Sequence, residues 1–344
     1  MRRIVVMGGT GFFGGAAVAL LRREGIEALA GSRRAAGDGA VRVDAEDAAS
    51  LRAALRPGDV VIDAAGPFQA RTALLARAAI AIGCDVIDIS DSLDHVLQVE
   101  ALRPEIEAAG IRILTSCSSV TTVVAILLRA GGVRAPVRVS VFLAPASRET
   151  ARPGTSGSLR HSLGRPIRLL RGGRLATATG WSESRPFRMP EPIGDARGYL
   201  MESVQAVTLP RLFPHLRDAD FRVDSRVPGM NRVFAAAARL PPLAAAIRRA
   251  GRGGLVLARL FGSTAGGMLV EAEDAAGRIE RSRLFARRRS YLAAVAPAVL
   301  AARAAAEGRM PERGLVPHDR HVPASDLLSF LDRLGIERSV ESSG

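Results

Sequence analysis

Over the first 130 residues, short apolar runs alternate with segments whose apolar positions recur at helical spacing. The apolar runs are short enough to be buried strands, and each is followed by a helical segment before the next begins. This alternation predicts an α/β fold with a doubly wound parallel sheet. The predicted strands are 4–7, 28–30, 41–43, 60–64, 86–89 and 111–114, and the predicted helices are 14–23, 45–55, 70–82, 93–109 and 120–129.

From residue 131 onward the pattern changes, because Pro and Gly become more frequent and the strand–helix rhythm disappears. Alternating strands are predicted at 137–143 and 267–273, and helices at 241–259, 291–307 and 324–334. The expected division is a dinucleotide-binding domain over 1–130, a second domain over 131–310 and a C-terminal segment over 311–344.

A glycine-rich turn joins the first predicted strand to the first predicted helix. It contains the spacing Gly-x-Gly-x-x-Gly, which in this context is typical of a dinucleotide-binding loop. Glycine permits the tight turn and lets the backbone approach a pyrophosphate, while the helix N-terminus offers N–H groups to the anion. The predicted cofactor-binding residues here are Gly8, Gly9, Thr10, Gly11, Phe12, Phe13 and Gly14.

The second predicted strand runs into Ser32, Arg33 and Arg34 rather than into an acidic residue. An NAD site usually has Asp or Glu at this place to bind the ribose hydroxyls, whereas Arg and Ser suit a 2′-phosphate. The sequence therefore favours NADP(H) as the cofactor. The alternative is that Arg33 and Arg34 are ordinary solvated charges.

Other polar or small residues follow later strands, and they are expected at the same edge of the sheet. Asp44 is interpreted either as a contact to the adenine end of the cofactor or as a helix N-cap. A turn of Ala65, Gly66, Pro67 and Phe68 would let the backbone pass close to the nicotinamide ribose.

Candidate proton carriers also stand at this edge, and they are Asp88, Asp91 and Cys117. Burial would raise the pKa of Asp88, although its carboxylate could instead accept backbone N–H groups in the following turn. In the second domain, Arg160 and His161 could meet an acidic substrate, or His161 could be a surface residue.

Composition narrows the possible functions of this chain of 344 residues. The formal charge of +14 comes from Arg alone, spread over the whole length, and only 4% of residues are aromatic, so nucleic-acid binding is not expected. The absence of Lys excludes a Schiff-base lysine. Cys84 and Cys117 lack metal-ligand spacing, so no metal is expected. The apolar runs are too short for a membrane span and the N-terminus lacks a signal-peptide pattern, which together predict a cytoplasmic protein.

Several segments together resemble the saccharopine dehydrogenase-like oxidoreductases, in particular their NADP-binding domain. The matching segments are the glycine turn at 8–14, the run 59–68 that ends in Gly66-Pro67-Phe68, the run 83–91, and 109–114 leading to Ser118-Ser119. The resemblance implies a Rossmann domain with an inserted α+β domain and a C-terminal helix that returns to the first domain. It also implies NADP(H) at the glycine turn, at Ser32 and Arg33, and at the Gly66-Pro67-Phe68 turn.

These observations predict hydride transfer between NADP(H) and a small metabolite in the cleft between the domains. The alternative is a non-catalytic NADP(H)-binding redox sensor or assembly protein. A third possibility is peripheral membrane contact through the basic segment 241–259, although a helix that faces the core is favoured there. A homodimer is also expected.

Overall fold

The computed structural model describes residues 1–249 and 251–343, and it divides the chain into two compact units. Unit 1 comprises Met1–Val123 and Leu292–Phe330, and unit 2 comprises Val124–Tyr291 and Leu331–Gly344. The chain thus leaves unit 1 once, forms most of unit 2 and then returns. This confirms the expected insertion of a second domain into the first.

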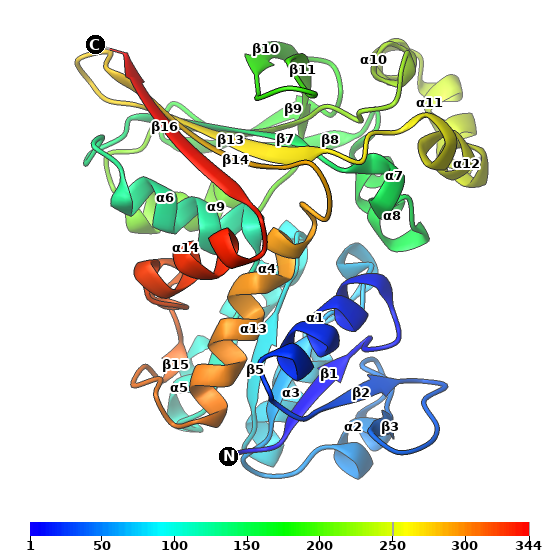
Figure 1. The fold of residues 1–344 in the computed structure, drawn as a ribbon, viewed down its shortest axis with the longest axis vertical. Coiled ribbons are helices and arrows are strands. Elements are labelled where there is room, and N and C mark those ends of the chain that lie inside the picture. Colours follow the sequence, from blue (N-terminus) through cyan, green and yellow to red (C-terminus); the bar gives the residue numbers. More distant parts are fainter. Residues whose placement is uncertain (250, 344) are drawn as a thin grey trace. The chain divides into compact units, whose positions relative to one another are not determined.

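Within the described residues, unit 1 is built on a seven-stranded parallel sheet of order β15-β6-β5-β4-β1-β2-β3 (Figure 1). All residues of the interior strand β1 are buried, as expected for a parallel sheet covered on both faces. The Rossmann-like fold is therefore confirmed. The strands are β1 Ile4–Met7, β2 Ala28–Ser32, β3 Ala40–Arg42, β4 Val60–Asp63, β5 Asp85–Asp88, β6 Arg112–Leu114 and β15 Gly314–Leu315.

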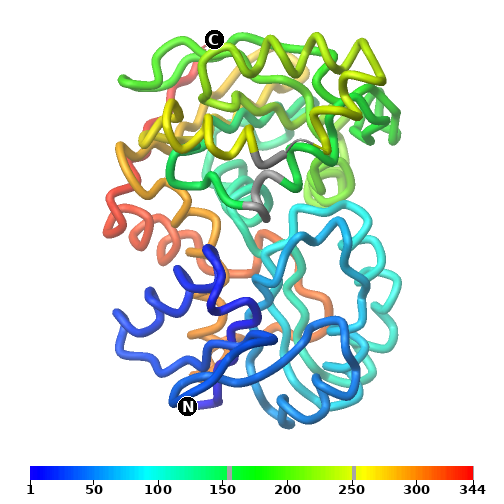
Figure 2. Tube along the Cα trace, turned by 90° about the vertical axis from the view of Figure 1, so that its right-hand side faces the viewer, coloured from blue at the N-terminus to red at the C-terminus, as the bar shows by residue number. Residues whose placement is uncertain are grey.

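Helices cover this sheet, and α1 packs against α13, which also packs on β4 and β5. The orange segment that contains α13 runs among the blue and cyan N-terminal elements of unit 1 (Figure 2). The helices are α1 Phe12–Arg23, α2 Ala48–Ala54, α3 Leu74–Ile82, α4 Leu93–Glu100, α5 Arg103–Ala108 and α13 Leu292–Ala306, with the short turns η1 Phe68–Ala70, η2 Ser119–Val123 and η3 His318–Arg320. Helix α14 Ala324–Arg333 crosses the boundary to unit 2.

Two predicted helices differ from the observed ones. The helix predicted over 93–109 is divided into α4 and α5, because Pro104 lies in the first turn of α5 and cannot continue the hydrogen bonding of a preceding helix. The helix predicted over 120–129 begins as the π-helical turn η2 and continues as α6 Val124–Ala130.

The domain boundaries also differ from the predicted ones. Helix α13 was expected in the second domain, but it belongs to unit 1, where most of its residues are buried. The segment 311–344 was expected to return to the first domain as a whole. Only its first part does so, because β16 Glu337–Ser343 pairs with β14 Ile279–Ala286 in the sheet of unit 2.

In the part of the chain that the structure describes, unit 2 contains a mixed nine-stranded sheet with the path β10-β11-β12-β7-β13-β14-β16, in which β8 also pairs with β12 and β9 pairs with β8. The predicted strands 137–143 and 267–273 correspond to β7 Arg138–Ala144 and β13 Gly266–Glu273. The remaining strands are β8 Pro166–Arg171, β9 Arg174–Thr179, β10 Ser184–Arg188, β11 Asp195–Met201 and β12 Asp218–Val223.

The helices of unit 2 include three at one end of its sheet, α10, α11 and α12 (Figure 1). Helices α11 and α12 occupy the range predicted as one helix over 241–259, with residue 250 outside the described residues. The core-facing interpretation of this range is wrong, since Leu243 and Val256 are exposed. No helix within the described residues combines the length and hydrophobicity that a membrane span requires. The helices are α6 Val124–Ala130, α7 Ser147–Thr150, α8 Pro153–Ser162, α9 Gln205–Leu212, α10 Met230–Arg239, α11 Pro241–Arg249 and α12 Gly251–Phe261.

Candidate functional site

Four strands of unit 1 end side by side in one row across the sheet. The register pairs Met7 of β1 with Gly31 of β2 and with Asp63 of β4, and Asp63 in turn pairs with Asp88 of β5. The loops that follow these strands therefore leave the same edge of the sheet. This is the edge at which ligands bind in open parallel sheets.

The glycine turn after β1 is packed tightly against its neighbours. A Cβ on Gly14 would overlap the carbonyl oxygen of Gly8, and a Cβ on Gly9 would lie 2.7 Å from the Cα of Ala30 in β2. Gly8 has a φ of 69°, in the left-handed region that favours glycine. The backbone itself forms this surface because side chains at these positions would not fit.

Helix α1 presents an uncapped N-terminus at the same edge. Its N-cap is Gly11, which has no side chain to accept hydrogen bonds, and its first turn contains no acidic residue. The partial positive charge of the helix end is therefore available to an anion. Thr10 and Gly11 are exposed, and the half-buried rings of Phe12 and Phe13 meet edge to face at 5.1 Å. The geometry suits a pyrophosphate.

The end of β2 carries hydroxyl and guanidinium groups. Ser32 is the last residue of the strand and is half-buried, and Arg33 and Arg34 follow it at the exposed surface. The close approach between Gly9 and Ala30 brings this strand end beside the glycine turn.

Asp44, which follows β3, does not cap α2. Its carboxylate accepts from the backbone N–H of Glu46 at 3.0 Å, and the N-cap of α2 is Asp47, which accepts from Ala49 and Ser50. The helix begins three residues later than the sequence pattern indicated, so the N-cap interpretation of Asp44 is wrong.

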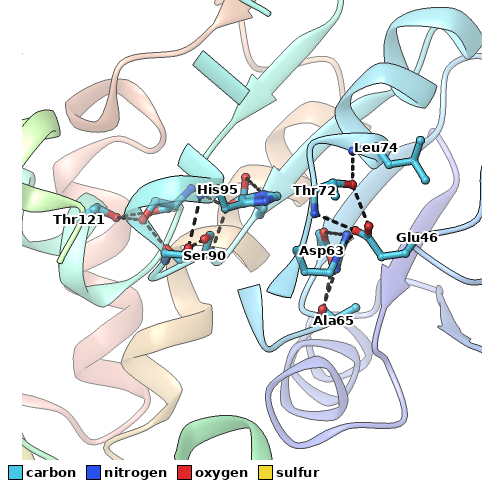
Figure 3. A network of polar contacts seen from close by, with 12 residues as sticks. Glu46, Asp63, Ala65, Thr72, Leu74, Ser90, His95 and Thr121 are labelled. Carbon is cyan, nitrogen blue, oxygen red and sulfur yellow. Dashed lines mark hydrogen bonds and ion pairs between the residues drawn. The ribbon is translucent and has the colours of Figure 1, made fainter. Parts of the chain in front are cut away.

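An ion-pair network centred on the buried side chains of Arg71 and Asp63 holds the turn after β4, and the sequence did not reveal it. The side chain of Arg71 donates to Asp63 at 3.0 Å and to Glu46 at 2.5 Å (Figure 3). Ala65 is fixed at both backbone groups, because its N–H donates to Asp63 and its carbonyl accepts from Arg71. Burial opposes the charged form of Arg71, but Asp63 and Glu46 together raise its pKa above the ordinary value. The only sequence signal was the acidic end of β4.

The Gly66-Pro67-Phe68 turn lies directly beyond this network. Gly66 and Pro67 are exposed, whereas Phe68 is buried and its ring lies 5.2 Å from the ring of His95. The Arg71 guanidinium lies 5.7 Å from the centre of the Phe68 ring. The turn thus exposes its backbone and Pro67 at the edge of the sheet, while the buried Phe68 ring holds it in place.

Asp88 is the most enclosed of the candidate proton carriers. One carboxylate oxygen accepts from the backbone N–H groups of Ser90 at 2.9 Å and Ser116 at 2.7 Å. The other oxygen lies 3.9 Å from Nε2 of His95, which is itself buried. Burial raises the pKa of Asp88 above its ordinary value. Sequence reasoning missed His95, which lies in the first turn of α4 and faces inward.

Asp91 and Cys117 lie at the same edge but in different surroundings. Asp91 is half-buried and accepts from the side-chain amide of Gln69 at 3.0 Å, which ties the loop after β5 to the loop after β4. Cys117 is fully buried, and burial raises the pKa of its thiol well above the ordinary value. Its backbone N–H donates to the carbonyl of Asp88 at 2.6 Å.

Arg160 and His161, the residues singled out in the second domain, lie in unit 2, as does Trp181. Trp181 is fully buried and packs against Tyr199 and Phe234, with ring centres 5.6 and 4.9 Å away. Arg160 donates to the carbonyl of Arg248 at 3.1 Å, and His161 is half-buried. In residues 1–249 and 251–343, no group of three or more His, Cys, Asp or Glu side chains could hold a metal ion.

Among solved structures, two dehydrogenases are similar to nearly the whole chain. The WlbA (WbpB) dehydrogenase from Thermus thermophilus, solved with NAD and alpha-ketoglutarate, is 11% identical with a TM-score of 0.42, and the match covers 96% of each chain. The dehydrogenase (MviM) from Clostridium difficile is 8% identical with a TM-score of 0.41, and the match covers 97% of this chain and 99% of that one. Values this low say nothing about a substrate.

Sequence comparison is more specific for unit 1. No curated protein sequence matches the chain. Residues 4–114, however, match the family model described as the saccharopine dehydrogenase NADP binding domain. The matched range runs from β1 to β6 and includes the glycine turn, the end of β2 and the Gly66-Pro67-Phe68 turn. This part of the chain is a nicotinamide dinucleotide-binding domain, similar to the NADP binding domain of saccharopine dehydrogenases.

Proposed function

We propose that this protein is an NADP(H)-dependent oxidoreductase that transfers a hydride between the nicotinamide and a small metabolite. The observation that carries the proposal is the row of strand ends, where the glycine turn and the N-terminus of α1 lie beside Ser32 and Arg33. A backbone cradle without side chains suits a pyrophosphate, and a Ser–Arg pair one strand away suits a 2′-phosphate.

The preference for NADP(H) over NAD(H) depends on the end of β2. A guanidinium can donate two parallel hydrogen bonds to phosphate oxygens, whereas NAD sites usually place a carboxylate here to bind the ribose hydroxyls. In this chain Ser32 and Arg33 occupy that place, and an acidic residue there would repel a 2′-phosphate.

When bound, NADP(H) supplies or accepts the hydride, so the chain itself has to position the substrate and handle one proton. We assign the proton to Asp88, a carboxyl buried at the row of strand ends whose pKa is raised by that burial. His95 lies 3.9 Å from the second carboxyl oxygen of Asp88 and packs on Phe68 of the turn expected beside the nicotinamide ribose. The pair Asp88–His95 can therefore hold a proton next to that turn.

Asp91 and Cys117 have different roles in this proposal. The thiol of Cys117 stays protonated because burial raises its pKa, so it is not a ready proton acceptor. Asp91 holds Gln69 and thereby orients the turn that contains Pro67 and Phe68. We therefore place Asp88 first among the candidate proton carriers.

Titration of the purified protein with NADPH and NADH, followed by nicotinamide fluorescence, tests the cofactor. We expect NADPH to bind more tightly, and Arg33→Ala to weaken NADPH binding by about 10-fold to 100-fold, since a hydrogen bond to a charged group contributes roughly 1.5–3 kcal/mol. NADH binding should change little. Arg52→Ala, which removes an exposed arginine from α2, is the matched control. Tighter binding of NADH by the wild type would refute the proposal.

Turnover distinguishes an enzyme from a non-catalytic NADP(H)-binding protein. The latter is favoured by one observation, that a carboxylate oxygen of Asp88 is already engaged by two backbone N–H groups. A screen of imines, enones and oxo acids for NADPH oxidation should find a substrate whose turnover falls at least about 100-fold in Asp88→Asn. Asp332→Asn, at an exposed position, should leave it unchanged.

Two outcomes of that screen count against the catalytic assignment. NADPH binding without turnover of any substrate class supports the non-catalytic alternative. Turnover that persists in Asp88→Asn, with NADPH binding intact, removes Asp88 from the reaction. The homodimer and the cytoplasmic location stay predictions, which sedimentation equilibrium and cell fractionation test.

A further inference from the structure

Helices α10, α11 and α12 carry a concentration of exposed apolar side chains, which we call the helical surface. Outside these helices and the residues that join them, the exposed large apolar side chains of the described chain are Met1, Leu175 and Val340. Leu260 and Phe261 are the most exposed of the surface, at 60% and 61%. Its members are Val233, Leu240, Leu243, Val256, Leu257, Leu260 and Phe261.

In α12 these side chains form one outward stripe. Val256, Leu257, Leu260 and Phe261 recur at the spacing that places residues on one side of a helix. The side chain of Arg259 instead donates to the carbonyl of Ala151 in unit 2, at 3.2 Å. A helix on a globular protein usually turns its apolar stripe toward the core and its charged side toward water. In α12 an arginine is bonded to the protein while the apolar stripe is exposed.

The three helices are held in place by contacts within unit 2. Phe234 of α10 packs edge to face against the buried Trp181, with ring centres 4.9 Å apart. Helix α10 packs on α11, and both α11 and α12 pack on α8 (Figure 1). Arg248 of α11 donates to the carbonyl of Leu163 at 2.7 Å. The exposed stripe thus belongs to an anchored helical cluster.

The charge around helices α10, α11 and α12 indicates which kind of partner binds the helical surface. Between residues 226 and 270 the sequence contains no Asp or Glu. Arg232, Arg239 and Arg249 are exposed on α10 and α11. The arginines of the segment are Arg226, Arg232, Arg239, Arg248, Arg249, Arg252 and Arg259. A second copy of this chain bound through the same face would bring like charges together, which is unfavourable. An anionic partner with an apolar interior is complementary to both features.

We propose that the helical surface docks onto an anionic phospholipid membrane. Leu260 and Phe261 enter the boundary between headgroups and acyl chains, as the apolar faces of interfacial helices do. The exposed arginines bind lipid phosphates, because a guanidinium matches phosphate oxygens and each basic residue near an anionic surface adds attraction. The docking is separate from the NADP(H) site of unit 1.

Co-sedimentation of the purified full chain with lipid vesicles tests this proposal. One set of vesicles is pure phosphatidylcholine, and the other contains about 30% phosphatidylglycerol, which supplies the negative surface. We expect binding to the anionic vesicles at least about tenfold stronger than to the neutral ones, and weaker at high salt because exposed charges are screened. Absence of binding to the anionic vesicles would overturn the proposal.

Two matched pairs of variants assign the binding to this surface. Leu260→Gln with Phe261→Gln should reduce binding about tenfold or more, since apolar area is lost, whereas Leu175→Gln with Val340→Gln removes similarly exposed side chains elsewhere and should not. Replacement of Arg232, Arg239 and Arg249 by Gln should also reduce binding about tenfold or more. Its control replaces the exposed Arg174, Arg287 and Arg288 by Gln.

The remaining outcomes also decide the question. Equal loss in a test variant and its control would show unspecific attraction of a basic protein and refute the assignment. If the wild type is a dimer that Leu260→Gln with Phe261→Gln converts to a monomer, and it does not bind vesicles, the surface is a self-association interface instead. The thermal unfolding midpoint shows whether each variant is folded. If Leu260→Gln with Phe261→Gln does not fold, the variant of Arg232, Arg239 and Arg249 decides whether this surface binds the vesicles.

Discussion

Gly14→Ala is the sharpest test of the glycine turn, because the structure predicts its effect from distances alone. The added Cβ would overlap the Gly8 carbonyl oxygen and would lie 2.5 Å from the Gly8 carbonyl carbon and 2.9 Å from the Gly9 nitrogen. All three atoms are backbone, so no side chain can rotate away. Since contacting carbon atoms normally lie about 3.5–4.0 Å apart, the turn has to move by roughly 1 Å.

This displacement should be costly for stability and for binding. Overpacking of a well-packed site costs about 1–3 kcal/mol, which should lower the free energy of unfolding in Gly14→Ala. The displaced residues Gly8 and Gly9 belong to the backbone cradle proposed for the pyrophosphate, and misplacement by roughly 1 Å can cost about 100-fold in function. We expect NADPH affinity to fall by at least about tenfold.

The neighbouring substitution Gly15→Ala is a matched control. A Cβ there would lie 3.5 Å from the carbonyl oxygen of Gly9, an ordinary contact. Ala is favoured over Gly inside a helix by about 1 kcal/mol, so this variant should be at least as stable as the wild type and should retain NADPH affinity. Urea unfolding and NADPH fluorescence titration measure both variants. Equal behaviour of Gly14→Ala and Gly15→Ala would refute the close packing of the turn.

Three further predictions concern stability within unit 1, and urea unfolding measures each. Arg71→Met should lose about 3–5 kcal/mol because Asp63 stays buried without its partner, whereas Arg77→Met, at an exposed position of α3, should be close to neutral. His321 is fully buried and, chiefly through burial, its pKa lies well below the ordinary value. The unfolded chain therefore binds a proton below about pH 6.5 that the folded chain does not, so stability should fall by up to about 1.4 kcal/mol per pH unit below that value, and His321→Asn should flatten this slope. Asp47→Ala should cost about 1 kcal/mol by removing the N-cap of α2, and no loss would contradict the observed cap.

Local pattern was sufficient for the strands and the edge of the sheet in unit 1. Strands such as β1 and β4 are continuous apolar runs buried on both faces, so they stand out against the polar turns around them. Because parallel strands all end at one edge, the order of strands and helices was enough to bring Asp88 and the Gly66-Pro67-Phe68 turn to the edge that carries the glycine turn.

Contacts between residues that are distant in sequence could not be predicted from the local pattern. The pair of Arg71 with Glu46 joins the loop before α2 to the turn after β4. His95 meets Asp88 and Phe68 only because α4 packs against that turn. An inward-facing histidine near a helix start has no distinctive sequence pattern. These partners become visible only when the chain is folded.

The two units differ in how much of their structure the sequence pattern predicts. Strands buried on both faces are continuous apolar runs, which the sequence pattern indicates directly. The glycine spacing indicates the backbone geometry of the turn that follows β1. Local sequence was therefore sufficient to predict the dinucleotide-binding domain. Helix α13 and strand β16 were assigned to the wrong units, because membership depends on packing partners far away in the chain. The same holds for the helical surface, since periodicity shows that a helix has an apolar side but only tertiary packing decides whether that side faces the core or the solvent.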